Sequence, residues 1–249
     1  MISFKQFLKD SEDHAAAGEA CAERIFRDCA PYLKQVQMQV NLSDIRRSTG
    51  ILWRGMKGMP DSDPANPCTK LAGNRERKPS DTNLALHTIL DAHLFKHFGF
   101  HYRSKGVFCS NSPVQASGYG SDLYLIFPIG EFKYVWSDTL YDAYAELDNR
   151  WHSNPPQSYL VILHDMNVWD KGLVDDDGFP IDYDEWYKLV GQWLDKMRPY
   201  KDSDLRECLR EHAASAGFGR EVMLQCSEYY AVSIHDARAV LEALEELKK

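Results

Sequence analysis

The order of secondary-structure patterns predicts an α+β fold whose strands pair antiparallel. Residues 3–36 have helical spacing, the middle of the chain mixes short strands with helices, and a strand pair follows near the C-terminus. This order lacks the regular alternation of strand and helix that is typical of parallel sheets. At 249 residues, the chain can bury a large core. We therefore expect one domain at residues 48–249 and a helical extension at residues 1–47 that packs on it.

Composition and charge narrow the classes of partner. Hydrophobic residues make up 44% of the chain and charged residues 27%, which is ordinary for a globular protein. The formal net charge of −8 argues against a nucleic-acid backbone as a partner of the whole surface, because that affinity depends on clustered Lys and Arg. The basic run at residues 70–78 is interpreted as a solvated loop.

The six cysteines form no Cys-x-x-Cys pair. The sequence therefore suggests neither a zinc site nor a disulfide framework, and we expect the reduced thiols of a cytoplasmic protein. The N-terminal residues lack the apolar run of a signal peptide, and no stretch approaches the ~20 apolar residues of a membrane span. We expect a protein of an aqueous cell interior with no membrane partner.

Local patterns give the elements in chain order. In the N-terminal half they predict helices at 3–9 and 11–36, a strand ending at Arg54, a long loop at 56–80, and a helix capped by Ser80, Asp81 and Thr82 and ended by Gly99. In the C-terminal half they predict strands at 106–109, 122–127, 132–136, 158–163, 221–225 and 229–234. The intervening helical segments are 113–119, 138–150, 184–197, 203–213 and 235–249.

A pair of histidines lies on one face of a predicted helix. His93 and His97 are four residues apart, a spacing that zinc can use. No carboxylate stands at a zincin-like position beside them. A structural role is favoured over metal binding, and we expect no metal. The acidic loop at residues 172–178 lacks the ligand spacing of an EF-hand and is interpreted as a solvated turn.

Three short pieces stand in an informative order. They are Leu-Trp-Arg-Gly at 52–55, Gly-Val-Phe-Cys-Ser-Asn-Ser at 106–112, and Arg-Glu-Val-Met-Leu at 220–224. Taken singly, each has a more ordinary interpretation: a surface Arg beside a turn, a helix cap, and a solvated Glu. Taken together, in this order and each next to a predicted strand, they favour a functional site formed by the three pieces.

The chain resembles the mono-ADP-ribosyltransferase superfamily of the Arg, Ser-Thr-Ser, Glu type. The matching elements lie between about residues 48 and 235. The resemblance implies a split antiparallel β-sheet core and an NAD-dependent glycosyltransferase that releases nicotinamide and passes ADP-ribose to a macromolecule. NAD would be a substrate.

The chemistry of that reaction gives each residue a role. Cleaving the nicotinamide–ribose bond passes through an oxocarbenium-like cation, which a carboxylate stabilises, and Glu221 is expected to supply it. Arg54 offers the bidentate donor fork that a pyrophosphate needs. Gly55 would let a backbone N–H and C=O approach the nicotinamide amide.

The remaining predicted site residues surround these. Ser110 is expected to hydrogen-bond and orient the catalytic carboxylate. Asn111 and Ser112 would complete the strand edge that faces the ligand. Tyr119 and Phe218 are candidates for stacking on nicotinamide or meeting the acceptor.

One residue departs from the family pattern. Two positions before its catalytic Glu the family carries Glu or Gln, which engages the acceptor, whereas this chain carries Gly219. Arginine-directed transfer is therefore in doubt, and NAD glycohydrolysis becomes the alternative reaction. A third alternative is a protein that keeps the fold, has lost turnover and serves a structural or interaction role.

A closer resemblance is to proteins of tailed bacteriophages. It is carried by the Arg-Gly strand, an Arg-Lys-Pro loop at 77–79, and the phrases GVFCS at 106–110 and FPIGEFKYVWS at 127–137. The resemblance implies that the acceptor is a host protein or nucleic acid. It also implies a location in the host cytoplasm, with association with the virion as a further expectation.

Overall fold

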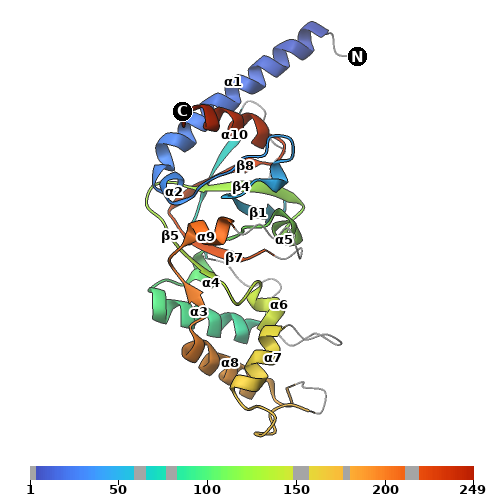
Figure 1. Ribbon diagram of the computed structural model, residues 1–249, viewed down its shortest axis with the longest axis vertical. Helices are drawn as coiled ribbons and strands as arrows, with labels where there is room; N and C mark the ends of the chain where they lie inside the picture. Colours follow the sequence, from blue (N-terminus) through green and yellow to red (C-terminus); the bar gives the residue numbers. More distant parts are fainter. Residues whose placement is uncertain (1–3, 59–65, 77–82, 148–156, 176–179, 211–218) are drawn as a thin grey trace.

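The computed structural model describes residues 4–58, 66–76, 83–147, 157–175, 180–210 and 219–249 (Figure 1). It confirms the α+β class: eight strands in this part of the chain form one antiparallel sheet in the order β2-β8-β4-β1-β3-β7-β5-β6. The strands are β1 (Leu52–Met56), β2 (Cys68–Ala72), β3 (Val107–Ser110), β4 (Asp122–Pro128), β5 (Lys133–Ser137), β6 (Tyr200–Lys201), β7 (Glu221–Gln225) and β8 (Glu228–Ser233).

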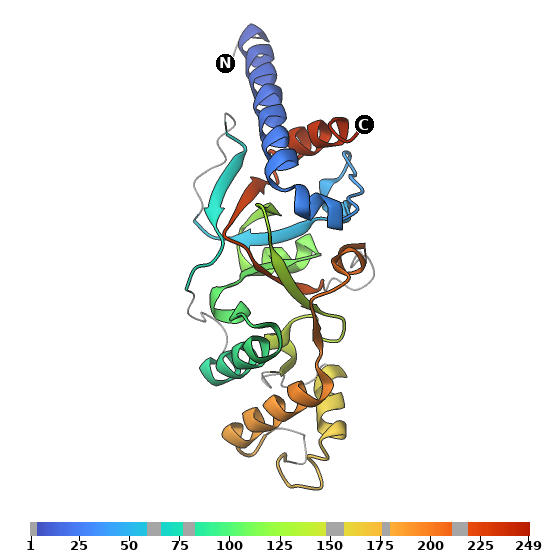
Figure 2. The ribbon, with the colours of Figure 1, turned by 90° about the vertical axis from the view of Figure 1, so that its left-hand side faces the viewer.

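Helices lie at both ends of an elongated molecule. They are α1 (Phe4–Asp28), α2 (Ala30–Gln35), a 3-10 turn η1 (Ile45–Arg47), α3 (Leu84–Phe98), α4 (Tyr102–Lys105), α5 (Pro113–Tyr119), α6 (Ala143–Leu147), α7 (Gln157–Asp165), α8 (Tyr183–Met197), α9 (Leu205–Arg210) and α10 (Ala237–Glu246). Figures 1 and 2 show α1 and α10 beside each other at one end, and α3, α7 and α8 at the other. No helix in the described ranges is long and apolar enough to cross a membrane.

Two hydrophobic clusters use opposite faces of the same strands. On β7, Val222 and Leu224 belong to the larger cluster with α1, α2 and α10, whereas Met223 belongs to the cluster with α3 and α8. On β5, Trp136 and Val135 divide in the same way. Since successive side chains of a strand point to opposite faces, both faces of the sheet are covered here. This explains why these strands read as apolar runs without alternation.

The N-terminal extension contributes to the main core. Ile25, Cys29 and Tyr32 are fully buried in it. The expected helices at 3–9 and 11–36 are wrong in their division, because one helix runs to Asp28 and a second begins at Ala30. Pro31 lacks a backbone N–H and fits only the first turn of a helix. The chain therefore ends α1 before it and begins α2 at Ala30.

A disulfide joins Cys21 of α1 to Cys68 of β2, whose Cα atoms are 5.6 Å apart. The expectation that all six thiols are reduced is therefore wrong. Cysteine spacing gave no signal because the two residues are 47 positions apart and meet only through the packing of α1 on the sheet. Cys29 and Cys226 stay free and buried, and burial raises the pKa of each thiol to about 12.

Three other expectations are corrected. The loop predicted at 56–80 contains β2, in which Lys70 pairs with Glu228 across the ladder with an N–O distance of 2.7 Å. The cap of α3 is Asn83, whose side chain accepts from Ala85 N, and residues 80–82 lie outside the described part. Residues 158–163 belong to helix α7, not to a strand. Short apolar runs of this length fit either element, and periodicity does not separate them.

Candidate active site

Three neighbouring strands bring the predicted site residues together. Ser110 on β3 lies opposite Glu221 on β7, and the same Ser110 lies opposite Trp53 on β1, next to Arg54. That contact between β1 and β3 is a single register pair, whereas β1 pairs with β4 over five positions. The two halves of the sheet therefore meet at this junction, and the junction carries the site residues.

Glu221 is buried at the head of β7. Only 6% of its surface is exposed, so the ordinary interpretation of a solvated strand-opening Glu is wrong. Nη1 of Arg103 donates to both carboxylate oxygens, at 3.1 Å to Oε1 and 3.2 Å to Oε2. The backbone N–H of Glu221 donates to Tyr141 O at 3.1 Å. The carboxylate is thus held away from bulk water and oriented by a cation.

Arg103 is itself buried, with 6% of its surface exposed. It stands on the short helix α4, and its guanidinium lies 4.8 Å from the ring centre of Phe108. Burial lowers the pKa of Arg103, but the negative charge of Glu221, with smaller contributions from its other neighbours, outweighs it and raises the pKa. Arg103 therefore stays a cation beside the Glu221 carboxylate. Arg103 is not among the site residues expected from the sequence, because no local pattern marks this charge as buried.

The side chain of Arg54 is half-buried and reaches the backbone of the neighbouring strand β3. Its Nη1 donates to Phe108 O at 2.7 Å, two residues before Ser110. Its buried Nε has no hydrogen-bond partner among the described residues. A buried donor without a partner costs free energy, so this guanidinium still has capacity to bind an anion.

Ser110 does not orient Glu221 as expected. Its Oγ donates to Gln115 Oε1 at 2.7 Å and accepts from Ser112 N at 3.0 Å. The orienting hydrogen bonds to the carboxylate come from Arg103 instead. Ser112 caps α5 by accepting from Gln115 N, so the helix-cap interpretation of this segment holds for Ser112.

Asn111 fixes the segment that leads into β7 through hydrogen bonds. Its Nδ2 donates to Cys208 O at 2.8 Å, and its Oδ1 accepts from Arg220 N at 2.6 Å. Asn111 N also donates to Arg220 O. This clamp sets the position of the residue just before Glu221. The middle residue of the Ser-Asn-Ser segment is therefore structural, rather than part of a free strand edge.

Gly219 lies against this clamp with no space for a side chain. A Cβ built there would lie 2.2 Å from Ser112 Cβ and 2.6 Å from Ser110 Oγ. The Glu or Gln that the resembling family carries at this position is therefore sterically excluded. Phe218, the other predicted acceptor residue, lies outside the described part of the chain.

Substituting Gly219 with Ala is expected to destabilise the protein by about 1–3 kcal/mol, the usual cost of overpacking a filled site. Urea unfolding followed by circular dichroism measures it. Gly118→Ala is the matched control, because a Cβ at Gly118 meets nothing within 4 Å and Ala is the better helix former. Equal stability of the two variants would contradict the close contact at position 219.

Gly55 is explained by packing inside the chain. A Cβ on Gly55 would lie 2.0 Å from Ala116 O, and a Cβ on Gly120 would lie 2.5 Å from the backbone of Met56. The two glycines let α5 lie directly on β1. The close approach expected of a ligand at Gly55 is thus made by the α5 backbone.

Two tyrosines border the ion pair. Tyr119 is 47% exposed, and its hydroxyl donates to Asp142 Oδ2 at 2.7 Å. Tyr200 is buried, and its hydroxyl has no hydrogen-bond partner within the described ranges. Burial, with a further contribution from the charge of Glu221, raises the pKa of both phenols. Both are therefore neutral near pH 7.

The chain was compared with protein-family models, curated proteins and solved structures, and none of these comparisons gives a match. The case for a function therefore depends on the residues and on their geometry.

Proposed function

We propose that this protein is a mono-ADP-ribosyltransferase that transfers ADP-ribose from NAD to a macromolecular acceptor. The observation that carries the proposal is the junction of β1, β3 and β7, where Arg54, Ser110 and Glu221 come from adjacent strands in the order that the family resemblance implies. In the reaction the bond from ribose C1′ to nicotinamide breaks, and nicotinamide leaves with the electron pair. The acceptor then bonds to C1′ and gives up its proton to solvent.

The state of Glu221 supports this chemistry. A carboxylate that stabilises a developing ribosyl cation must be ionised and pre-positioned. Arg103 Nη1 donates to both oxygens and so fixes the carboxylate, and a neighbouring cation favours the charged form of a carboxyl group. Because the site is buried, a carboxylate there interacts more strongly with a cation than it would in water.

Arg54 is the proposed pyrophosphate ligand. Its Nη1 donates to Phe108 O, which anchors the guanidinium, while no residue in the described ranges accepts from its Nε. A planar fork suits two phosphate oxygens, whereas an ammonium offers only a point charge.

Arg54→Lys is expected to weaken NAD binding by roughly 10–100-fold, the loss of one to two charge-assisted hydrogen bonds. Isothermal titration calorimetry with NAD measures the change. Arg238→Lys, at an exposed arginine of α10, serves as the control and should leave the affinity unchanged. If Arg54→Lys binds NAD as tightly as the wild type, Arg54 is not the pyrophosphate ligand.

The direct test is to incubate the purified protein with NAD and to measure free nicotinamide, with and without a bacterial lysate. A label on the adenine side of NAD that moves to lysate macromolecules only in the presence of the protein supports transfer. No nicotinamide release under either condition contradicts the proposal. In that case, absence of NAD binding by calorimetry would favour a structural or interaction role.

NAD glycohydrolysis is the second candidate, and the position of Gly219 favours it. Because no side chain fits there, the site lacks the group that positions an acceptor in the resembling family. Water would then attack C1′. Nicotinamide release that is equally fast without lysate, with no labelled macromolecule, selects this reaction over transfer.

A further inference from the structure

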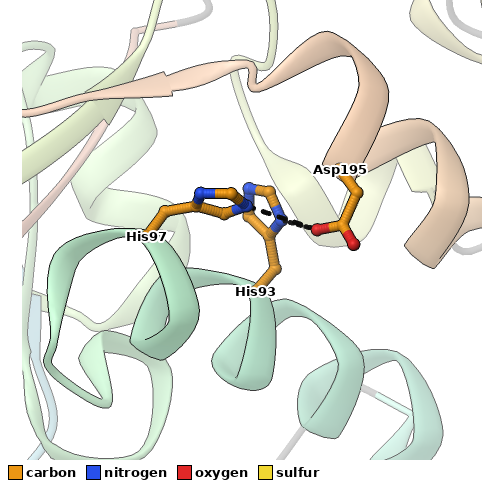
Figure 3. A group of neighbouring side chains, drawn as sticks. All are labelled: His93, His97 and Asp195. Carbon is orange, nitrogen blue, oxygen red and sulfur yellow. Dashed lines mark hydrogen bonds and ion pairs between the residues drawn. The ribbon is translucent and has the colours of Figure 1, made fainter.

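A cluster of two histidines and one aspartate lies between α3 and α8, and it contains the histidine pair noted in the sequence. His93 and His97 stand one turn apart on α3, and Asp195 stands on α8 (Figure 3). Figure 3 shows both imidazole rings directed at the same carboxylate. His93 Nδ1 lies 3.1 Å and His97 Nε2 lies 3.3 Å from Asp195 Oδ1.

These spacings match the edges of a small coordination polyhedron. Ligands at about 2.0–2.1 Å from a tetrahedral zinc ion lie ~3.3–3.4 Å from one another. The three ligand atoms of the cluster all lie within 4.8 Å of one another. Small side-chain movements would therefore bring all three within coordination distance of one ion. The i, i+4 histidine pair is a spacing that zinc sites on helices use.

We propose that His93, His97 and Asp195 bind one divalent transition-metal ion of the zinc class, which fastens α3 to α8. Three protein ligands leave a fourth position for water. The role is structural, because the ion would join two helices of the smaller hydrophobic cluster. The proposal does not depend on the proposed function of the site around Glu221.

Burial and charge suit such an ion. His93 is 5% exposed, and burial disfavours the charged imidazolium that cannot coordinate a metal. The side chain of Asp195 is 43% exposed, which leaves a path for the ion and its water. Imidazole nitrogens and a carboxylate oxygen are ligands that zinc takes in proteins.

Lys96 competes for the same carboxylate. Its Nζ lies 2.5 Å from Asp195 Oδ2, the oxygen that neither histidine contacts. The lysine side chain is 59% exposed, so it can move into solvent when a metal binds. Removing its charge should therefore strengthen binding.

The test is calorimetric titration of the full-length, chelator-treated protein with Zn²⁺. We expect one ion per chain. We also expect the melting temperature of the protein to rise by roughly 5–10 °C when the free Zn²⁺ concentration is about 100-fold above the dissociation constant. The variants His97→Ala and Asp195→Asn alter partly exposed ligands without opening the core. Each should weaken binding at least about 10–100-fold, the loss seen even for outer partners of a metal.

His164→Ala is the matched control, because His164 is an exposed histidine beside a carboxylate, Asp165, outside the cluster. It should bind Zn²⁺ as the wild type does, and Lys96→Met should bind more tightly. Co²⁺ serves as the spectroscopic probe and should give visible bands of nitrogen and oxygen ligation. Absence of binding, equal binding in all variants, or a thiolate-to-cobalt charge-transfer band would overturn the proposal.

Discussion

Glu221→Gln is expected to lower the rate of nicotinamide release by at least about 100-fold, the usual loss when one group that stabilises transition-state charge is removed. The substitution keeps the size of the side chain and an acceptor oxygen for Arg103, but it removes the charge that would face the ribosyl cation. Initial rates of NAD cleavage at saturating NAD measure the effect. A variant that cleaves NAD as fast as the wild type would remove the proposed mechanism.

Glu228→Gln is the matched control for this prediction. Glu228 also opens a strand, but it is exposed and pairs with Lys70 at the edge of the sheet. Its substitution should leave the rate unchanged. Far-ultraviolet circular dichroism must show that both variants are folded at the assay temperature, since Glu221→Gln also weakens a buried ion pair.

Arg103→Met is expected to destabilise the protein by about 3–5 kcal/mol, because it leaves the buried Glu221 carboxylate without its cation. The cost arises from the desolvated charge, and the Met side chain fills part of the volume of the Arg stem. Urea unfolding measures it. A loss no larger than that of a surface substitution would show that Glu221 reaches water or another cation.

A double variant separates charge from packing. Arg103→Met combined with Glu221→Leu replaces both partners with apolar side chains, which is often close to neutral for a buried pair. It should recover most of the stability lost in the single variant. Arg27→Met removes an exposed ion pair with Asp28 and should change the unfolding midpoint little. If the double variant is no more stable than Arg103→Met, the stability lost in the single variant arises from lost packing and not from the unpaired charge of Glu221.

The strand assignments around the site could be made from sequence because they depend on local order. The predicted strands that end at Arg54, Cys109 and Gln225 each lie in a short apolar run, and all three form strands of the sheet. The prediction failed at 158–163, where a short apolar run fits a strand or a buried helix equally well. It also failed at β2, whose five residues are embedded in a polar stretch.

The residues whose partners lie far along the chain could not be found in this way. Arg103 and Glu221 are 118 positions apart, and His93 and Asp195 are 102 apart. Nothing near Arg103 in the sequence distinguishes it from an ordinary surface charge. Nothing near His93 in the sequence supplies the carboxylate that faces it, because Asp195 lies on another helix.

Apolar periodicity and strand-bounding residues are properties of neighbouring residues, so the amino-acid sequence sufficed to predict the α+β class and most strands, including those that carry Arg54, Ser110 and Glu221. Folding alone decided that Glu221 is buried against Arg103, that position 219 has no space for a side chain, and that Asp195 faces two histidines. The physical reason is the same in each case. Burial, steric exclusion and ion pairing depend on which distant segments pack together, and packing is a property of the whole chain.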